Sequence, residues 1–268
     1  MSLISETLKR LADRNEGALV AYVTGGDPSV DLTNKIVLGL ADGGADIVEI
    51  GIPFSDPIAD GPTIQAAANR ALKAKTNPAK ILSLVGEVKR KRTVPVVLLT
   101  YYNPVYRMGL ENFFESAARF GVDGVIIPDL PIEESLEYRK VAHAHDVDTV
   151  FLAAPSTSDE RLKRIASQSS GFLYLASLFG VTGTRRHLDK NLPRLVRRTR
   201  RLADKLPVCV GFGISTPTHV ATVLKAGANG AIVGSALVEI VARNSNRKDL
   251  PELVARSVRK LKTATHQS

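Results

Sequence analysis

The stretch VCVGFGISTPTHVATVLKAGANGAIVGS, residues 208–235, contains two short apolar segments with an amphipathic segment between them. Residues 208–211 and 231–233 are nearly continuous apolar runs, which is typical of parallel strands covered on both faces. Residues 215–217 (Ser-Thr-Pro) are a good helix start, and the spacing predicts a helix over residues 216–226. The stretch therefore predicts a strand–helix–strand unit in which both strands lead into glycine.

The same alternation recurs along the chain. Six further apolar segments predict strands, at residues 19–24, 46–51, 94–100, 124–128, 149–153 and 172–176. Amphipathic segments such as residues 31–40, 133–145 and 159–167 lie between them and predict helices. Eight strand–helix repeats favour a (β/α)8 TIM barrel, and residues 3–12 predict an extra N-terminal helix ahead of it.

The main alternative is an open, doubly wound sheet. It is less favoured because the first turn, Gly25-Gly26-Asp27-Pro28, lacks the GxGxxG pattern of dinucleotide-binding sheets. No Pro/Ser-rich linker or break in composition divides the chain. We therefore expect residues 1–268 to form a single barrel domain.

The composition excludes several classes of protein. With 44% hydrophobic and 24% charged residues, the chain is not disordered, and its single cysteine, Cys209, allows no internal disulfide. The start, MSLISETLKR, lacks the apolar core of a signal peptide, and no apolar run is long enough to span a bilayer. We expect a cytoplasmic protein without a membrane partner.

The net charge of +9 raises nucleic acid as a partner, but the positive charge is unevenly distributed. Residues 1–184 sum to −3, whereas residues 185–201 carry +7 and residues 243–262 carry +5. In the first basic segment Arg194, Arg197, Arg198, Arg201 and Lys205 fall on one predicted helix face. Because stacking aromatics and nucleic-acid motifs are lacking, a solvated helix face is the favoured interpretation and no nucleic-acid partner is expected.

Glycine-rich turns follow the last predicted strands. Phe212-Gly213 follows the seventh, Gly234-Ser235 follows the eighth, and residues 180–183 (Gly-Val-Thr-Gly) follow the sixth. Barrels commonly hold a phosphate between the last two loops, where glycine lets backbone N–H groups approach the anion. The glycines would alternatively serve tight turns only. Their recurrence in consecutive loops favours a phosphate site.

Two carboxylates near the second strand are the candidates for chemistry. Glu49 lies among apolar residues in the middle of the predicted strand 46–51, whose first residue is Asp46. Burial raises the pKa of such a group towards neutrality, so that it can act as both acid and base; pairing with a core polar residue is the alternative. Asp60, in the proline-rich loop that follows, either reaches over the barrel mouth or caps the next helix.

Other strand ends and several absences narrow the chemistry. Tyr102 follows the third strand and lines a pocket or packs, and Asp129 follows the fourth and can orient a neighbour by hydrogen bonding. No histidine lies at a strand end, no strand contains lysine, and no nucleotide-binding or GxSxG motif is present. We therefore expect acid–base catalysis by carboxylates on a phosphorylated substrate, with neither metal nor cofactor on this chain.

The stretch GADIVEIGIPFSDPIADGPTIQ, residues 44–65, closely resembles the signature of the tryptophan synthase α subunit family. Residues 101–106 (YYNPVY), 128–131 (PDLP), 180–183 (GVTG), 211–215 (GFGIS) and 234–235 (GS) also match that family in order. The resemblance runs from about Tyr22 to Leu237. Position 22 is often Phe in the family, so the hydroxyl of Tyr22 needs a partner or water.

The resemblance implies cleavage of indole-3-glycerol phosphate to indole and D-glyceraldehyde 3-phosphate. Glu49 would move protons between indole C3 and the adjacent glycerol hydroxyl, and Asp60 would accept the indole N–H. The phosphate would lie on N–H groups of Gly183, Phe212, Gly213, Gly234 and Ser235. The indole ring would be surrounded by Tyr22, Ile64, Leu99, Tyr102, Ile127, Tyr174 and Thr182. Loop six, the segment after the sixth predicted strand, would close over the substrate and bring Thr182 to Asp60.

The resemblance also implies a partner. Indole would pass to a β subunit that carries pyridoxal phosphate, in an assembly of two α and two β subunits. Loops two and three are the segments after the second and third predicted strands. They include Pro53, Asp56 and Asn103-Pro104 and resemble the family's docking surface for the β subunit. Another phosphate-binding barrel, such as a phosphoribosyl isomerase, is a rival, but Glu49 within the 44–65 signature disfavours it.

Overall fold

The computed structural model describes residues 2–177 and 189–266. Its strands are parallel and pair in the order β5-β4-β3-β2-β1-β9-β8-β7-β6. Their bounds are β1 Ala18–Thr24, β2 Ile47–Gly51, β3 Val96–Leu99, β4 Gly124–Ile126, β5 Asp148–Val150, β6 Leu152–Ala153, β7 Leu173–Ala176, β8 Val208–Gly211 and β9 Gly230–Val233.

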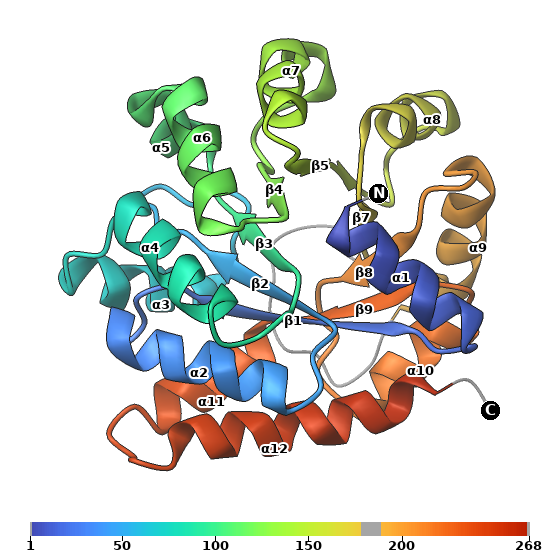
Figure 1. The fold of residues 1–268 in the computed structure, drawn as a ribbon. Helices are drawn as coiled ribbons and strands as arrows, with labels where there is room; N and C mark the ends of the chain where they lie inside the picture. The colour runs from blue at the N-terminus through green and yellow to red at the C-terminus, as the bar shows by residue number, and fades with distance from the viewer. Residues whose placement is uncertain (1, 178–188, 267–268) are drawn as a thin grey trace.

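The strand order closes on itself. β5 and β6 stand at the two ends of the order, yet only Phe151 separates them along the chain. They are two halves of one extended segment, of which β5 pairs with β4 and β6 pairs with β7. The result is a barrel of eight strand segments (Figure 1). The predicted barrel is therefore confirmed, with the single strand predicted over residues 149–153 divided at Phe151.

Helices surround the barrel, as Figure 1 shows. Those that follow the successive strands on the outside are α2 Val30–Asp42, α4 Pro78–Lys89, α6 Leu110–Phe120, α7 Leu136–Ala144, α8 Asp159–Gln168, α9 Leu192–Leu202, α10 Pro217–Lys225 and α12 Leu250–Lys262. Additional helices after β2, β3 and β9 are α3 Pro62–Lys73, α5 Tyr102–Met108 and α11 Ser235–Arg243. Two predicted helix starts are confirmed, because the side chains of Ser158 and Thr216 accept hydrogen bonds from the first turns of α8 and α10.

Alternate residues of each strand face either the barrel interior or the helices. Ile47 and Val97 lie in the interior cluster, whereas Val48 and Leu98 pack in the layer between sheet and helices. Both faces of the strands are buried, which explains why the strand sequences are apolar without alternation. A polar side chain that faces the interior from such a strand is therefore a candidate for function.

The predicted N-terminal helix, α1 Leu3–Asp13, covers the N-terminal end of the barrel (Figure 1). Its buried face presents Ile4, Leu8 and Leu11 to the interior cluster. The hydroxyl of Ser2 adds a hydrogen bond to the carboxylate of Asp148 at the start of β5. The side chains of α1 thus fill the barrel interior at this end.

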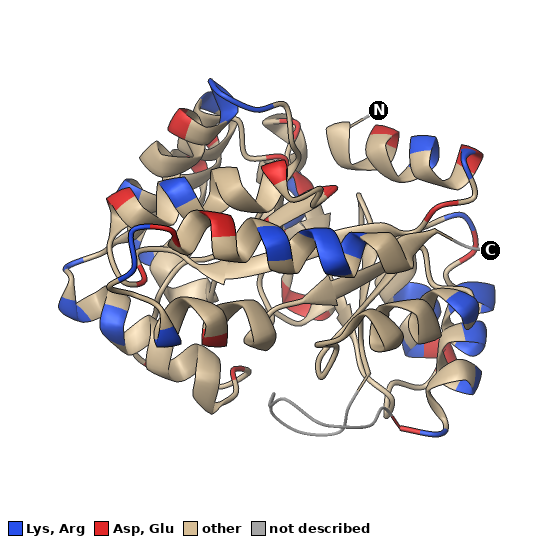
Figure 2. Cartoon of the chain, turned by 90° about the horizontal axis from the view of Figure 1, so that it is seen from below, with Lys and Arg blue, Asp and Glu red and all other residues tan. Residues whose placement is uncertain are grey.

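Figure 2 shows Lys and Arg crowded on the right-hand side of the molecule, where Figure 1 places α9. Arg194, Arg197 and Arg201 are exposed on α9, as the helical spacing predicts. Arg198 instead forms an ion pair with Asp159 at 2.6 Å, and Lys205 lies beyond the end of the helix. No helix within the described ranges is long and apolar enough to cross a membrane.

We expect Ile4→Ala to lower the free energy of unfolding by about 2–5 kcal/mol, because it leaves a cavity between α1 and the barrel. Arg10→Ala, an exposed change on the same helix, should alter it by less than about 0.5 kcal/mol. Urea unfolding followed by circular dichroism measures both. Equal effects of the two substitutions would contradict the role given to α1.

Candidate active site

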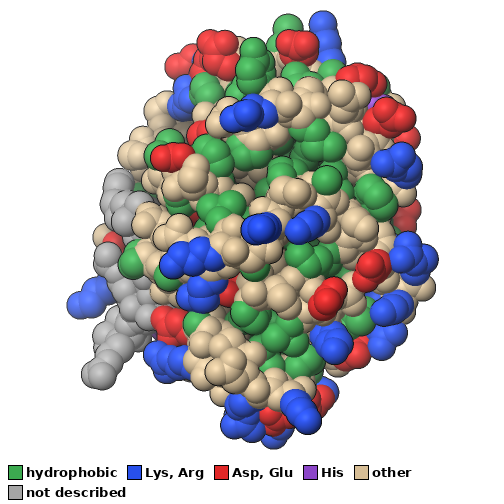
Figure 3. Space-filling model, turned by 90° about the vertical axis from the view of Figure 1, so that its left-hand side faces the viewer, with side chains coloured by type: hydrophobic (Ala, Val, Ile, Leu, Met, Phe, Trp, Pro, Cys, Tyr) green, Lys and Arg blue, Asp and Glu red, His purple; other side chains and the backbone are tan. Residues whose placement is uncertain are grey.

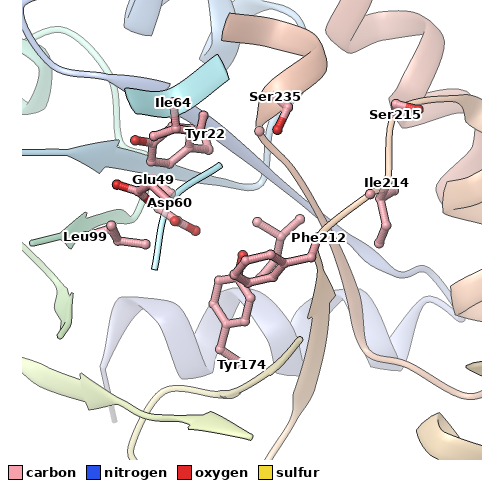
Figure 4. A pocket seen from close by; sticks show the side chains of 13 residues that line it. Tyr22, Glu49, Asp60, Ile64, Leu99, Tyr174, Phe212, Ile214, Ser215 and Ser235 are labelled. Carbon is pink, nitrogen blue, oxygen red and sulfur yellow. The ribbon is translucent and has the colours of Figure 1, made fainter. Parts of the chain in front are cut away.

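A cavity opens at the carboxyl ends of the strands, where active sites of such barrels lie (Figure 4). Its walls come from several strands and from the segments that follow them. The lining residues are Tyr22, Glu49, Asp60, Ile64, Leu99, Tyr174, Phe212, Gly213, Ile214, Ser215, Ile232, Gly234 and Ser235.

Glu49 is the inward-facing polar residue of β2. Only 1% of its surface is exposed, and within the described part of the chain its Oε2 has no hydrogen-bond partner. Burial, and next the nearby charge of Asp60, raise the pKa of Glu49 to about 8. At neutral pH this carboxyl group therefore holds a proton that it can donate.

Asp60 lies beside Glu49 in the cavity, as Figure 4 shows. Burial raises the pKa of Asp60 to about 6, and a hydrogen bond from the Tyr101 hydroxyl opposes this rise. The Tyr101 oxygen in turn accepts the N–H of Ala59 at 3.1 Å. Tyr101 is itself 2% exposed, so its hydroxyl fixes the loop that carries Asp60.

The two carboxyl groups consequently have unlike states near neutral pH. Glu49 is mostly protonated and Asp60 is mostly ionised, because their pKa values are about 8 and about 6. A pair of carboxyl groups whose pKa values are moved apart in one cavity is the usual arrangement for separate acid and electrostatic roles.

Two glycines make room for two buried tyrosines. A Cβ on Gly51 would lie 2.2 Å from the Tyr22 hydroxyl, and one on Gly211 would lie 2.3 Å from that of Tyr174. The Tyr22 hydroxyl finds a partner in Thr24 Oγ1 at 3.3 Å, which meets the requirement raised from the sequence. Each tyrosine hydroxyl therefore lies over a glycine at the end of the neighbouring strand, where a larger residue would not fit.

The opposite wall is built for an anion. Phe212 and Gly213 have φ of +70° and +76°, so the chain turns sharply as it leaves β8. α11 begins at Ser235 and has no side-chain cap, unlike α10. Its first N–H groups have no acceptor within the helix, and the helix dipole adds positive potential there. This wall can therefore bind a phosphate without lysine or arginine.

The structure brings most of the predicted site residues into this one cavity. Both carboxylates line it, together with four predicted ring contacts and four predicted phosphate contacts: Tyr22, Ile64, Leu99, Tyr174, Phe212, Gly213, Gly234 and Ser235. Thr182 and Gly183 lie outside the described residues.

Tyr102 and Ile127 lie elsewhere. Tyr102 begins α5, where its ring packs beside Tyr106 at 6.0 Å and its N–H donates to Asp129 at 2.9 Å. Ile127 packs in the layer between sheet and helices. One step along a strand reverses the direction of a side chain, so the neighbouring residues face inward instead.

Those neighbours are Tyr101 and Ile126. Ile126 belongs to the interior cluster, and Tyr101 continues the inward-facing series that starts with Val97 and Leu99. The period of two within the third strand was the available signal for Tyr101. Asp129 orients a neighbour by hydrogen bonding, as expected, and that neighbour is the backbone of Tyr102.

The sequence did not single out Ile214, Ser215 and Ile232, which also line the cavity. Ile232 follows from the alternation within β9, whereas the other two depend on the turn after Gly213. Among the described residues no group of three or more His, Cys, Asp or Glu side chains is arranged to hold a metal ion.

Sequence comparisons match nearly the whole chain to one family. The family model "Tryptophan synthase alpha chain" matches residues 8–266. The tryptophan synthase alpha chain of Prochlorococcus marinus is 41% identical over 267 residues, covering 100% of this chain and 95% of the relative. That of Methanopyrus kandleri is 46% identical and covers 95% of this chain and 93% of the relative.

Solved structures agree as well. Tryptophan synthase of Mycobacterium tuberculosis superposes with a TM-score of 0.91 at 34% identity, over 100% of this chain and 99% of that chain. The tryptophan synthase complex of Pyrococcus furiosus gives 0.85 at 43% identity, over 92% and 98%. By family model, full-length relatives and structure, the chain belongs to the tryptophan synthase alpha chain family, and it is an indole-3-glycerol-phosphate lyase of tryptophan biosynthesis.

Proposed function

We propose that residues 1–268 act as one barrel domain that cleaves indole-3-glycerol phosphate to indole and D-glyceraldehyde 3-phosphate, with Glu49 as general acid and base. One observation carries this proposal. A single cavity holds two carboxyl groups of unlike pKa on one wall and an open helix N-terminus on the other. These are the groups that a phosphorylated substrate without its own strong electrophile requires.

The protonated Glu49 carboxyl donates its proton to indole C3, which converts the ring into an electron-accepting indolenine. The resulting carboxylate then takes the proton of the glycerol hydroxyl next to the ring. The C–C bond breaks, its electron pair returns to the indole ring, and the hydroxyl carbon becomes the aldehyde carbon. The proton has moved from oxygen to carbon and Glu49 is restored. A pKa near 8 serves both transfers, because it lies close to neutrality.

Ionised Asp60 accepts the indole N–H. Protonation at C3 places positive charge on that nitrogen, so the nearby carboxylate stabilises the charged state more than the neutral substrate. The hydrogen bond from Tyr101 keeps the pKa of Asp60 lower than burial alone would, so that the anion persists at neutral pH.

The remaining wall residues bind the two ends of the substrate. Tyr22, Ile64, Leu99 and Tyr174 contact the ring, while N–H groups of Phe212, Gly213, Gly234 and Ser235 bind the phosphate. The same proposal assigns Gly183 to the phosphate and Thr182 to a contact with Asp60. Contacts to the indole ring at one end and to the phosphate at the other thus hold the scissile bond beside Glu49.

We further propose a tryptophan synthase β subunit as partner, in an assembly of two α and two β chains. The Pyrococcus furiosus neighbour is titled a tryptophan synthase complex. Loops two and three here carry Pro53, Asp56 and Asn103, and next to them Ile58 and Tyr106 are 75% and 68% exposed. Figure 3 looks onto the side with α3–α6, where hydrophobic side chains lie between charged ones. We therefore assign the partner to loops two and three, where these two large apolar side chains are exposed.

Glu49→Gln should reduce indole release from indole-3-glycerol phosphate by about 10²–10⁴-fold, because glutamine keeps the shape and loses the proton transfer. Spectrophotometric detection of indole measures this loss. Full activity in this variant would refute the role of Glu49.

Stability serves as the control for Glu49→Gln. Between pH 4.5 and about 8 the folded wild type holds a proton that its unfolded chain has released, so its stability falls as the pH rises through this range. Glutamine does not titrate, so the variant does not lose stability in this way. It should therefore be the more stable protein at pH 9, which would show that inactivity does not come from unfolding.

Tyr101→Phe should make activity more sensitive to acid. Without the Tyr101 hydrogen bond the pKa of Asp60 rises above about 6, so the ratio of kcat/KM at pH 6 to that at pH 8 should fall about three- to tenfold. Tyr102→Phe is the matched control and should leave the ratio unchanged. A fall in this ratio for Tyr102→Phe, with none for Tyr101→Phe, would instead indicate that Tyr102 is the tyrosine that contacts Asp60.

Ile58→Asp should weaken binding to a β subunit by about 10–100-fold, since burial of an isoleucine side chain contributes about 1.5–3 kcal/mol. Leu136→Asp, at another exposed apolar position outside loops two and three, is the control. Isothermal titration calorimetry measures both affinities. Equal losses would argue against docking at loop two.

A further inference from the structure

We propose that Ser177 is a positioning residue for the substrate phosphate. It lies at the end of β7 and fixes two successive peptide planes whose N–H groups face the anion. This inference rests on the proposed function, since it concerns the phosphate wall described above.

Phe212 is the strained residue of that wall. Its φ of +70° lies in the left-handed region, which costs a non-glycine residue free energy unless its surroundings hold it there. Its ring packs edge-on against Tyr174, with centroids 5.7 Å apart and planes at 72°. That contact involves the ring and does not orient the peptide groups on either side of Phe212.

Ser177 holds both of those peptide groups. Its backbone N–H donates to the carbonyl of Gly211 at 3.0 Å. Its hydroxyl donates a short hydrogen bond to the carbonyl of Phe212. Because Ser177 is 4% exposed, little water can replace either bond. Ser177, which directly follows β7, therefore holds two consecutive carbonyl groups of the segment that leaves β8.

Because the peptide bond is planar, the two hydrogen bonds of Ser177 also fix the directions of two N–H groups. In a trans peptide the C=O and the following N–H point opposite ways. When the carbonyls of Gly211 and Phe212 both point to β7, the N–H groups of Phe212 and Gly213 both point away from it. In a regular strand successive carbonyls alternate, and the left-handed conformation of Phe212 breaks that alternation here.

The side away from β7 is the side of β9, which pairs with β8. There Gly234 and Ser235 begin the uncapped α11. The two N–H groups fixed by Ser177 and the first N–H groups of α11 thus converge on one space. Paired N–H groups of this kind form a concave anion site, and loss of one fixed peptide plane should weaken it.

The test compares Ser177→Ala with wild type by isothermal titration calorimetry, using glycerol 3-phosphate as the probe for the anion wall and indole as the probe for the ring wall. We expect about tenfold weaker glycerol 3-phosphate binding and unchanged indole binding. Ser177→Thr keeps the hydroxyl and should restore the affinity. Ser169→Ala is the matched control, because the Ser169 hydroxyl also donates to a backbone carbonyl, that of Ile165 at 2.8 Å, away from the cavity.

Steady-state kinetics supply a second readout. Ser177→Ala should raise the KM for indole-3-glycerol phosphate about tenfold with a smaller change in kcat, since Glu49 and Asp60 stay in place. If the alanine variant does not fold, Ser177→Cys carries the same test with a weaker donor, and its loss should be smaller.

Two failures are distinguishable. If wild type does not bind glycerol 3-phosphate, the proposed phosphate wall is wrong. If wild type binds it and the Ser177 variants bind equally well, or lose indole and glycerol 3-phosphate affinity alike, the phosphate wall stands and the role of Ser177 is refuted.

Discussion

A carboxyl group buried in an apolar barrel is the constraint on which the site depends. Glu49 is almost fully buried and, among the described residues, its Oε2 has no hydrogen-bond partner. Charging such a group costs free energy, which is why its pKa rises to about 8. The fold bears this cost within a large apolar core, and the same desolvation gives Glu49 a proton at neutral pH.

The cavity exists because the two ends of the barrel differ. At the N-terminal end Ile4, Leu8 and Leu11 of α1 fill the interior. At the other end Gly51 and Gly211 replace side chains that would collide with Tyr22 and Tyr174. Filling one end stabilises the barrel, and emptying the other leaves space for a ligand. Neither feature is local, since each glycine makes room for a tyrosine on a neighbouring strand.

The two walls of this space divide the chemistry. The β1–β3 side supplies titratable groups whose pKa values depend on burial and on Tyr101. The β7–β9 side supplies backbone N–H groups whose direction depends on peptide geometry at Phe212 and on the start of α11. The first wall acts through protons and the second through fixed dipoles. Strand ends from both halves of the chain must meet before either can act on one substrate.

The sequence by itself indicated the barrel, Glu49 and the glycine turns, because apolar strand runs, an isolated acidic residue and φ-permissive residues are local signals. For Asp60 the residues alone left two alternatives, and the fold of the loop after β2 placed it in the cavity. It did not determine which of two adjacent residues faces inward: Tyr101 and Ile126 do, rather than Tyr102 and Ile127. That choice depends on strand register, which is set by pairing between distant segments. The tertiary structure alone also decided that Ser177 holds the backbone of Phe212, since 35 residues separate them and the pairing of β7 with β8 brings them together.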